Sequence, residues 1–344
     1  MEVSPRPLET DDAVAFLRRP SSYAEAPASV TAIETHMAWV FLTDRYAYKM
    51  KKPVRLGRLD TRTLTARRRL CVAEVALNRR LAAGVYLGLC AIRVGEEGEL
   101  ILDEEPSDAS RVGEWVIKMR RLSASAMLDE RLANREQGHL RSEVRQLGHR
   151  LARFYAGARA VPVSPTTYRR RFLDIIDTAE QALRAGPPVL QRAQVGALAA
   201  RLRAVMRDEA PLLADRVAAG RVVEGHGDLR PEHVCLEHRP VVIDGLEFST
   251  ALRTVDPVDE LAFLSMECVR LGAPWVGPLL QEMYVARTGD ATPPRLRAFY
   301  GAFRAFQRAR LAVRHLQAGD AREPEAVWIR QARDYMEQAA IRLS

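Results

Sequence analysis

Residues 224–234 read EGHGDLRPEHV and residues 241–248 read VVIDGLEF, and these two short stretches decide the fold. They form an island of strand-like residues and glycine- or proline-containing loops inside a region of helical periodicity. Each stretch carries an aspartate beside a glycine, Asp228 in the first and Asp244 in the second. Two carboxylates at neighbouring strand ends suit one general base and one ligand of a divalent cation. The pattern fits two turn-capping aspartates equally well, because aspartate is common in turns.

The periodicity around this island changes along the chain. Runs rich in β-branched and aromatic residues predict strands at 30–35, 38–42, 46–50, 89–94, 99–102 and 115–119. Helical spacing of apolar residues predicts helices at 11–19, 61–83, 135–156, 165–185, 191–219, 257–271, 278–288, 294–317 and 324–342. The pattern alone therefore predicts an α+β, two-lobed layout, in which a small sheet with one helix precedes a larger helical lobe.

The composition is that of a globular chain. Of the 344 residues, 47% are hydrophobic and 28% are charged, which excludes wholesale disorder, a collagen-like repeat and a small disulfide-stapled fold. No apolar run approaches the roughly 18 residues of a membrane helix, and the N-terminus lacks a signal-peptide pattern. The four cysteines lie far apart without a C-x-x-C pair, as expected of buried thiols in a reducing compartment. We therefore expect a cytoplasmic protein.

Positive charge is in excess, because 52 Lys and Arg against 44 Asp and Glu give a formal net charge of +8. Such an excess suits an anionic ligand such as a nucleotide as well as a nucleic acid. The cationic residues are scattered along the predicted helices, which disfavours a nucleic-acid-binding module. Three of the only four lysines lie at positions 49, 51 and 52. Because a compact ammonium fits between phosphate oxygens, we interpret this group of lysines as functional.

The two aspartate stretches also carry a family resemblance. Residues 226–233, HGDLRPEH, resemble the kinase catalytic loop H-x-D-L-x-x-x-N, and residues 243–245, IDG, resemble the metal-binding aspartate segment that follows it. The H-G-D form is typical of the aminoglycoside phosphotransferase-like (choline kinase-like) superfamily. This resemblance implies a two-lobed protein-kinase-like fold, with a small antiparallel-sheet N-lobe that carries one helix and a larger, mainly helical C-lobe.

Further segments extend the resemblance over about residues 30–275. Residues 34–36 and 48–53 look like the nucleotide-binding lobe of that superfamily. Residues 256–264 resemble its D-x-x-x-D-L-A helix, with Glu260 where aspartate is usual. The resemblance implies the following division of the chain: residues 1–29 as an N-terminal helix and linker, 30–122 as the nucleotide-binding lobe and hinge, and 123–344 as the helical lobe with the catalytic loop at 224–249.

The resemblance assigns roles to individual residues in phosphoryl transfer, which requires positioning, a metal ion and neutralised charge. Asp228 would accept or orient the proton of the attacking hydroxyl group, and Asp244 would hold Mg²⁺ at the nucleotide phosphates. A lysine of the third strand would bind the phosphates, and Glu74 of the following helix would fix it. Strand alternation places Lys49 and Lys51 on one face of the sheet, and we favour Lys49 with Lys51 as the alternative.

Other residues complete the expected site. His226 and Arg230 lie in the catalytic loop beside Asp228, where His226 is expected to act as a scaffold rather than as a base. Backbone groups near Met119, at the end of the last sheet strand, would receive the nucleotide base. The expected cofactors are ATP, or GTP in its place, and Mg²⁺.

Two departures from the family pattern affect the site. His233 stands where the catalytic loop usually has asparagine, so a second metal site is in question, because hard cations prefer oxygen ligands. His233 could ligate the metal or contact Asp228 or a phosphate instead, and Glu247 could supply the missing oxygen ligand. The chain also has no glycine-rich G-x-G-x-x-G loop before the third strand, so the strand pair around His36 is expected to cover the phosphates.

The charge of the C-terminal helices bears on the acceptor. Residues 251–344 contain 11 acidic and 13 basic residues, a poor receptor for a polycationic aminoglycoside. The sequence therefore predicts a phosphotransferase that acts on a hydroxyl group of a neutral or anionic small molecule. The alternatives are a catalytically degenerate nucleotide-binding pseudokinase and, less favoured, a basic nucleic-acid-binding module. We expect no nucleic-acid or membrane partner.

Overall fold

The structure is a computed structural model, which describes residues 8–57, 59–107, 110–134, 139–319 and 323–344. The chain divides into two compact units. The first comprises residues 1–126 together with 241–249, and the second comprises 127–240 together with 250–344. This division differs from the expected one in a single respect that matters here. The segment 241–249 carries Asp244 and was expected in the helical lobe, but it packs with the first unit.

The first unit contains a six-stranded antiparallel sheet with the strand order β1-β2-β3-β8-β6-β7. Its strands are β1 (Thr31–Glu34), β2 (Ala38–Leu42), β3 (Tyr46–Lys51), β6 (Tyr86–Val94), β7 (Leu100–Asp103) and β8 (Val112–Arg120). The other elements are α1 (Thr10–Leu17), η1 (Pro20–Ser22), the pair β4 (Arg55–Leu56) and β5 (Leu59–Asp60), α2 (Leu64–Ala82), η2 (Ala124–Ala126) and β11 (Val241–Val242). The expected small antiparallel sheet with its long helix is confirmed.

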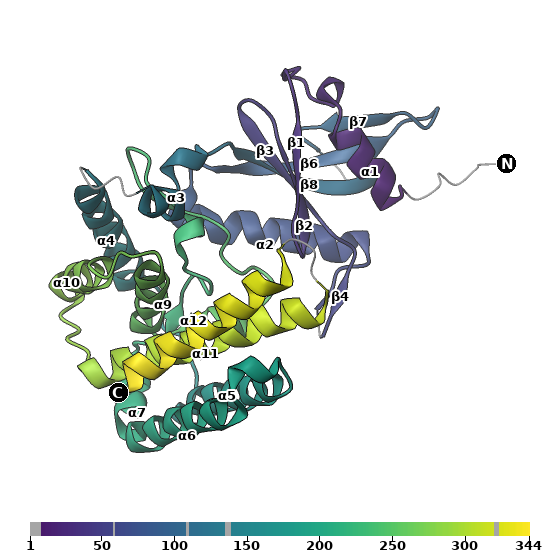
Figure 1. The fold of residues 1–344 in the computed structure, drawn as a ribbon. Coiled ribbons are helices and arrows are strands. Elements are labelled where there is room, and N and C mark those ends of the chain that lie inside the picture. Colours follow the sequence, from purple (N-terminus) through teal and green to yellow (C-terminus); the bar gives the residue numbers. More distant parts are fainter. Residues whose placement is uncertain (1–7, 58, 108–109, 135–138, 320–322) are drawn as a thin grey trace. The chain divides into compact units, whose positions relative to one another are not determined.

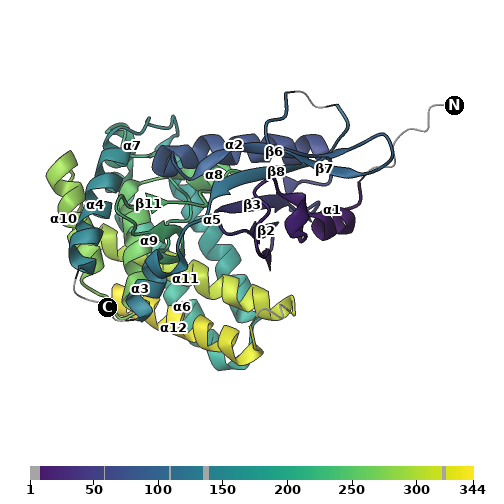
Figure 2. The ribbon, with the colours of Figure 1, turned by 90° about the horizontal axis from the view of Figure 1, so that it is seen from above.

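The two faces of this sheet carry different helices (Figures 1 and 2). Helix α1 covers the face on which Tyr48 and Met50 of β3 are buried. Helix α2 lies against β6 and β8 on the opposite face. Because side chains alternate along a strand, Lys49 and Lys51 point to the α2 face, as predicted. A single helix therefore meets both ammonium groups.

Helix α2 is fixed at its first turns. The Thr63 side chain caps its N-terminus by accepting a hydrogen bond from the Ala66 amide. One turn further on, the buried Arg67 side chain donates from Nε to both carboxylate oxygens of Glu114 on β8, at 3.0 and 2.8 Å. Burial raises the pKa of Glu114, and Arg67 opposes that rise. This ion pair sets the position of α2 on the sheet, and so of every residue that α2 contributes.

The second unit is mainly helical, as predicted (Figure 1). Its helices are α3 (Leu128–Ala133), α4 (Leu140–Ala156), α5 (Pro165–Arg184), η3 (Pro188–Leu190), α6 (Arg192–Asp208), α7 (Ala210–Ala218), η4 (Pro231–His233), α8 (Thr250–Arg253), α9 (Pro257–Arg270), α10 (Val276–Thr288), α11 (Pro294–Gln317) and α12 (Glu325–Leu343). Short strands lie among them: β9 (Val223–Glu224), β10 (Val234–Cys235) and β12 (Thr254–Val255).

One expected helix was wrong in its length. The periodicity predicted a continuous helix over 191–219, but the chain forms α6 and α7 with a break at Glu209. Pro211 lies in the first turn of α7, where a proline ring would collide with a carbonyl of any preceding helical turn. The start of the helix expected over 135–156 lies outside the described residues, and α4 accounts for the remainder.

The remaining sequence expectations concern the cysteines and the membrane. All four cysteines are buried thiols. Burial raises the pKa of Cys71 to about 12, which makes a reactive thiolate unfavourable there. Within the described ranges, none of the helices has both the length and the apolarity that crossing a membrane requires.

Replacing Arg67 tests the anchoring of α2. We expect Arg67→Met to lower the free energy of unfolding by about 3 to 5 kcal/mol, because it leaves the Glu114 carboxylate buried without its cation. Chemical denaturation measures the loss. Arg69→Met, at an exposed position on the same helix, is the control and should change stability by less than about 0.5 kcal/mol. Equal effects of the two substitutions would contradict the anchoring role.

Candidate active site

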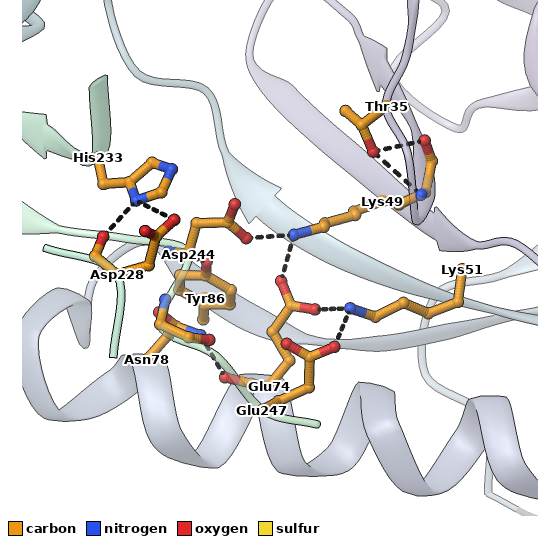
Figure 3. A network of polar contacts seen from close by, with 12 residues as sticks. Thr35, Lys49, Lys51, Glu74, Asn78, Tyr86, Asp228, His233, Asp244 and Glu247 are labelled. Atoms are coloured by element: carbon orange, nitrogen blue, oxygen red, sulfur yellow. Dashed lines mark hydrogen bonds and ion pairs between the residues drawn. The ribbon is translucent and has the colours of Figure 1, made fainter. Parts of the chain in front are cut away.

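Two lysines of β3 share one buried carboxylate of α2 (Figure 3). Lys49 Nζ lies 2.7 Å from Glu74 Oε1, and Lys51 Nζ contacts Glu74 Oε2. The Glu74 side chain has 0% exposed surface. The predicted pairing of Glu74 with a lysine of the third strand is thus present in the structure, and both candidate lysines take part in it.

Two acidic residues of the segment 241–249 complete this cluster (Figure 3). Lys49 Nζ lies 2.5 Å from Asp244 Oδ1, and Lys51 Nζ lies 2.6 Å from Glu247 Oε1. The Asp244 side chain is 45% exposed, whereas the Glu247 side chain is only 7% exposed. Asp244 is therefore accessible to a ligand while it contacts Lys49, and Glu247 is a buried partner of Lys51.

Two further residues, which the sequence analysis did not single out, hold the Asp244 segment. The Asp244 amide donates to Tyr86 Oη at 3.1 Å, and the Gly245 amide donates to Asn78 Oδ1 at 2.8 Å. Asp244 adopts a positive φ of 61°, an unusual conformation for a residue with a side chain. Asn78 is buried one helical turn after Glu74, and the sequence carried no signal for its contact with Gly245.

The charges of the cluster stabilise one another. Burial by itself raises the pKa of Glu74, but Lys49 and Lys51 outweigh this effect and hold the pKa below its usual value. Burial likewise lowers the pKa of Lys49, and Asp244 and Glu74 more than offset it. Glu74 and Lys49 are thus both charged at neutral pH, and Lys49 offers a desolvated, fixed ammonium group.

In the second unit, Asp228 lies in a tightly bonded loop. Arg230 Nε donates to Asp228 Oδ2 at 3.0 Å, and Arg230 also forms an ion pair with Glu232 at 2.5 Å. His233 Nδ1 lies 2.8 Å from the backbone oxygen of Asp228, and His233 Nε2 lies 3.3 Å from Arg230 Nη2 (Figure 3 draws the first contact). His226 Nδ1 accepts the amide of Asp228 at 3.3 Å, which fits the expected scaffold role.

These contacts define the chemical state of the loop. Burial raises the pKa of Asp228, but Arg230, His233 and Arg308 outweigh it and hold the pKa below its ordinary value. Because the backbone oxygen of Asp228 can only accept, His233 Nδ1 carries a proton and donates to it. His233 thus fixes the loop from within.

Glu260 anchors the backbone just before Asp228. Its carboxylate accepts hydrogen bonds from the amides of His226, at 3.0 Å, and Gly227, and from Tyr155 Oη at 2.8 Å. Gly225 packs so closely that an added Cβ would lie 2.4 Å from Glu260 Oε2. Glutamate in place of the usual aspartate therefore has a function here: it receives two loop amides and one hydroxyl group.

The two aspartates on the same helix have separate partners. Asp256 caps the N-terminus of α9 and accepts from Nε and Nη2 of the buried Arg216 guanidinium. Asp259 accepts from Arg304 of α11 at 2.7 and 2.6 Å. These buried ion pairs join α9 to its neighbours and so hold Glu260 in place.

The expected nucleotide-base contact remains a prediction. Met119 is buried near the end of β8, opposite Ala47 and Tyr86. The amides of the next two residues, Arg120 and Arg121, already donate to backbone oxygens of the same unit. The β1–β2 turn, expected to cover the phosphates, is closed by the Thr35 hydroxyl group, which bonds to both backbone groups of Ala38 (Figure 3).

The donor chemistry fits one magnesium ligand from the first unit. Among the described residues, no group of three or more His, Cys, Asp or Glu side chains could hold a metal ion by itself. Mg²⁺ is typically bound by one or two carboxylates together with substrate phosphates and water, so the exposed carboxylate of Asp244 suits it. Glu247 and His233 are engaged with Lys51 and with the Asp228 loop, and their metal roles stay predictions.

The fold matches that of known small-molecule kinases. The amicoumacin kinase hAmiN, solved in complex with AMP-PNP, Ca²⁺ and Ami, superposes with a TM-score of 0.50 at 12% identity, over 96% of this chain and 94% of that chain. A choline/ethanolamine kinase family protein from Mesorhizobium loti gives a TM-score of 0.49 at 15% identity, covering 97% of both chains. Aminoglycoside phosphotransferases are also structural neighbours. The match to the amicoumacin kinase, together with the antiparallel sheet and the mainly helical second unit, confirms the predicted kinase-like fold.

Sequence relatives are known from mycobacteria. The chain is 31% identical over 302 residues to an uncharacterised protein of Mycobacterium tuberculosis, a match that covers 85% of this chain and 56% of the relative. The chain therefore spans about half the length of the curated relatives it matches. No protein-family model matches the chain.

The anchoring of the Asp228 loop can be tested at Glu260. We expect Glu260→Gln to lower the free energy of unfolding by about 2 to 3 kcal/mol, because one acceptor oxygen becomes an amide donor that faces other donors. Amide hydrogen exchange at His226 and Gly227 should accelerate. Glu282→Gln, which removes a solvent-exposed ion pair with Arg145, is the control. Unchanged exchange at both amides would show that Glu260 does not hold the loop.

The acid dependence of stability tests Glu74. A carboxylate with a depressed pKa stabilises the fold above its unfolded pKa, about 4.3, and loses this contribution as the pH falls. We expect Glu74→Gln to cost about 3 to 5 kcal/mol at pH 7. The difference in unfolding free energy between the variant and the wild type should become smaller when the pH is lowered below that pKa. Chemical denaturation at pH 7 and at the lower pH measures this difference. Glu97→Gln, in an exposed turn, is the control. A gap independent of pH would contradict the charge assignment.

Proposed function

We propose that this chain is an ATP- and Mg²⁺-dependent phosphotransferase that acts on a hydroxyl group of a neutral or anionic small molecule, with GTP as an alternative nucleotide. One observation carries the proposal: Lys49 contacts both Glu74 and Asp244 within a kinase-like fold. A buried ammonium beside an accessible carboxylate is the charge pattern that a metal-bound triphosphate requires.

In this proposal the first unit binds the nucleotide. The Lys49 ammonium, fixed by Glu74, donates to phosphate oxygens, and the Asp244 carboxylate holds Mg²⁺. When bound, Mg²⁺ supplies the positive charge that neutralises the phosphate oxygens. Lys51 and Glu247 keep Glu74 in place from the buried side. Backbone groups near Met119 receive the nucleotide base.

The second unit supplies the general base of the reaction. Asp228 is ionised at neutral pH, because its pKa is depressed, and it accepts or orients the proton of the acceptor hydroxyl group. Arg230 and His233 hold the Asp228 loop, and His226 serves as its scaffold.

A pseudokinase is the alternative, and His233 is the observation that favours it. The usual asparagine would offer an amide oxygen to a second metal ion, whereas His233 bonds to Asp228 and Arg230. A chain with this loop would bind nucleotide through the first unit without transferring phosphate.

The cytoplasmic location expected from the sequence stays a prediction.

A transfer assay separates the two functions. The chain is incubated with Mg²⁺, radiolabelled ATP or GTP, and a panel of neutral, anionic and cationic hydroxyl compounds. We expect transfer in the wild type and a loss of about 10²- to 10⁴-fold in Asp228→Asn, since a general base contributes that much. AMP-PNP affinity, measured by calorimetry, should persist in this variant and fall in Lys49→Met.

The control is Asp215→Asn, at an exposed position in the second unit. It should leave both transfer and binding unchanged. AMP-PNP binding without transfer to any acceptor would establish the pseudokinase. Absence of both binding and transfer in the wild type would contradict the proposal and its alternative together.

A further inference from the structure

Two arginines of the second unit share one buried carboxylate, an arrangement that the proposed mechanism does not use. Arg308 Nε lies 3.1 Å from Glu267 Oε1, and Arg270 Nε lies 3.0 Å from Glu267 Oε2. Tyr335 Oη donates to the same carboxylate, at 2.9 Å from Oε1. Glu267 is 2% exposed at its side chain, and Tyr335 is fully buried. We call Arg270, Arg308, Glu267 and Tyr335 the arginine clamp.

The Tyr335 ring contacts both guanidinium groups of the clamp. Each lies over the Tyr335 ring, with its central carbon 5.6 Å from the ring centroid for Arg270 and 5.5 Å for Arg308. Within the described residues, the only hydrogen bonds of these guanidiniums start from their Nε atoms. Their side chains are 32% and 22% exposed. The terminal nitrogens of two fixed forks are therefore available to a ligand.

The clamp carries a net positive charge. Two guanidiniums face one carboxylate, so one positive charge is not compensated within the clamp. A guanidinium fork matches the geometry of phosphate and carboxylate oxygens, which it binds with two parallel hydrogen bonds. Two forks held by one carboxylate and one ring therefore fit a multiply charged anionic group.

The clamp also belongs to the neighbourhood of Asp228. Helix α9, which carries Glu267 and Arg270, packs against η4, and η4 begins three residues after Asp228. Arg308 lies one turn after Arg304 on α11, on the face that meets α9. The charge of Arg308 helps to depress the pKa of both Asp228 and Glu232.

We propose that Arg270 and Arg308 bind an anionic group of the phosphate acceptor, which makes the substrate a hydroxyl compound that already carries a phosphate or carboxylate. This inference rests on the proposed function, because it places the anion near the base of that reaction. Glu267 and Tyr335 are positioning residues, because each of them contacts both guanidinium groups.

The first experiment measures anion binding without turnover. Inorganic phosphate and malonate are titrated by calorimetry into the full chain saturated with AMP-PNP and Mg²⁺, so that the nucleotide site is occupied. We expect the wild type to bind at least one of the two anions, and Arg270→Gln/Arg308→Gln to bind it about 100-fold more weakly. Arg295→Gln/Arg333→Gln, with the same change in net charge at exposed positions of α11 and α12, is the matched control.

The second experiment compares acceptors in the transfer assay. Ribose 5-phosphate and glycerate represent the two anion types, with ribose, glycerol and choline as their neutral and cationic counterparts. Anionic acceptors should have the higher kcat/KM, and the double Gln variant should lose this preference through KM. Arg270→Lys/Arg308→Lys keeps both charges but loses the fork, so it should also lose most of the preference even if the Gln variant does not fold.

The outcomes separate the two proposals. Anion binding that is absent in the wild type, or unaffected in both double variants, overturns the arginine clamp whether or not AMP-PNP binds. Equal kcat/KM for charged and uncharged acceptors overturns it as well. Failure of AMP-PNP to bind, with anion binding measured in its absence and lost in the Gln variant, would instead contradict the proposed phosphotransferase.

Discussion

Glu74 is a carboxylate without exposed side-chain surface that contacts two ammonium groups, and the geometry of the first unit depends on these contacts. Removing the Glu74 charge takes one carboxylate from each of the two ammonium groups, and breaking a buried ion pair costs about 3 to 5 kcal/mol. The cluster therefore constrains β3, α2 and the segment 241–249 together. As a result, Asp244 is held against Lys49 although its own side chain is nearly half exposed.

The buried acidic groups of the second unit are also held by contacts with hydrogen-bond donors, but each has different partners. Asp256, Asp259 and Glu260 lie within five residues of one another, and each is buried against a separate donor. Glu260 binds backbone amides, so it shapes the loop that presents Asp228, whereas the two aspartates bind arginines and join helices. The buried charges thus determine where the loop lies, and the depressed pKa of Asp228 follows from that placement.

Much of the architecture could be predicted because it is encoded locally. Strand alternation placed Lys49 and Lys51 on one face, and helical spacing located the helix of Glu74. The interpretation failed where long-range packing decides the outcome. The amide contacts of Asn78 and the shared carboxylate of Glu267 join residues far apart in the chain, and periodicity carries no signal for them. Pro211 indicates the break between α6 and α7. The prediction missed it because the apolar periodicity continues on both sides of the break.

The central claim is that Asp244 and Lys49 bind a metal–nucleotide complex. Electron paramagnetic resonance of Mn²⁺, a spectroscopic substitute for Mg²⁺, tests it directly on the chain in the presence of AMP-PNP. The account predicts a protein-bound Mn²⁺ spectrum that requires the nucleotide, persists in Asp228→Asn and is lost in Asp244→Asn. An identical bound spectrum in Asp244→Asn, or no bound Mn²⁺ in the wild type, would contradict it.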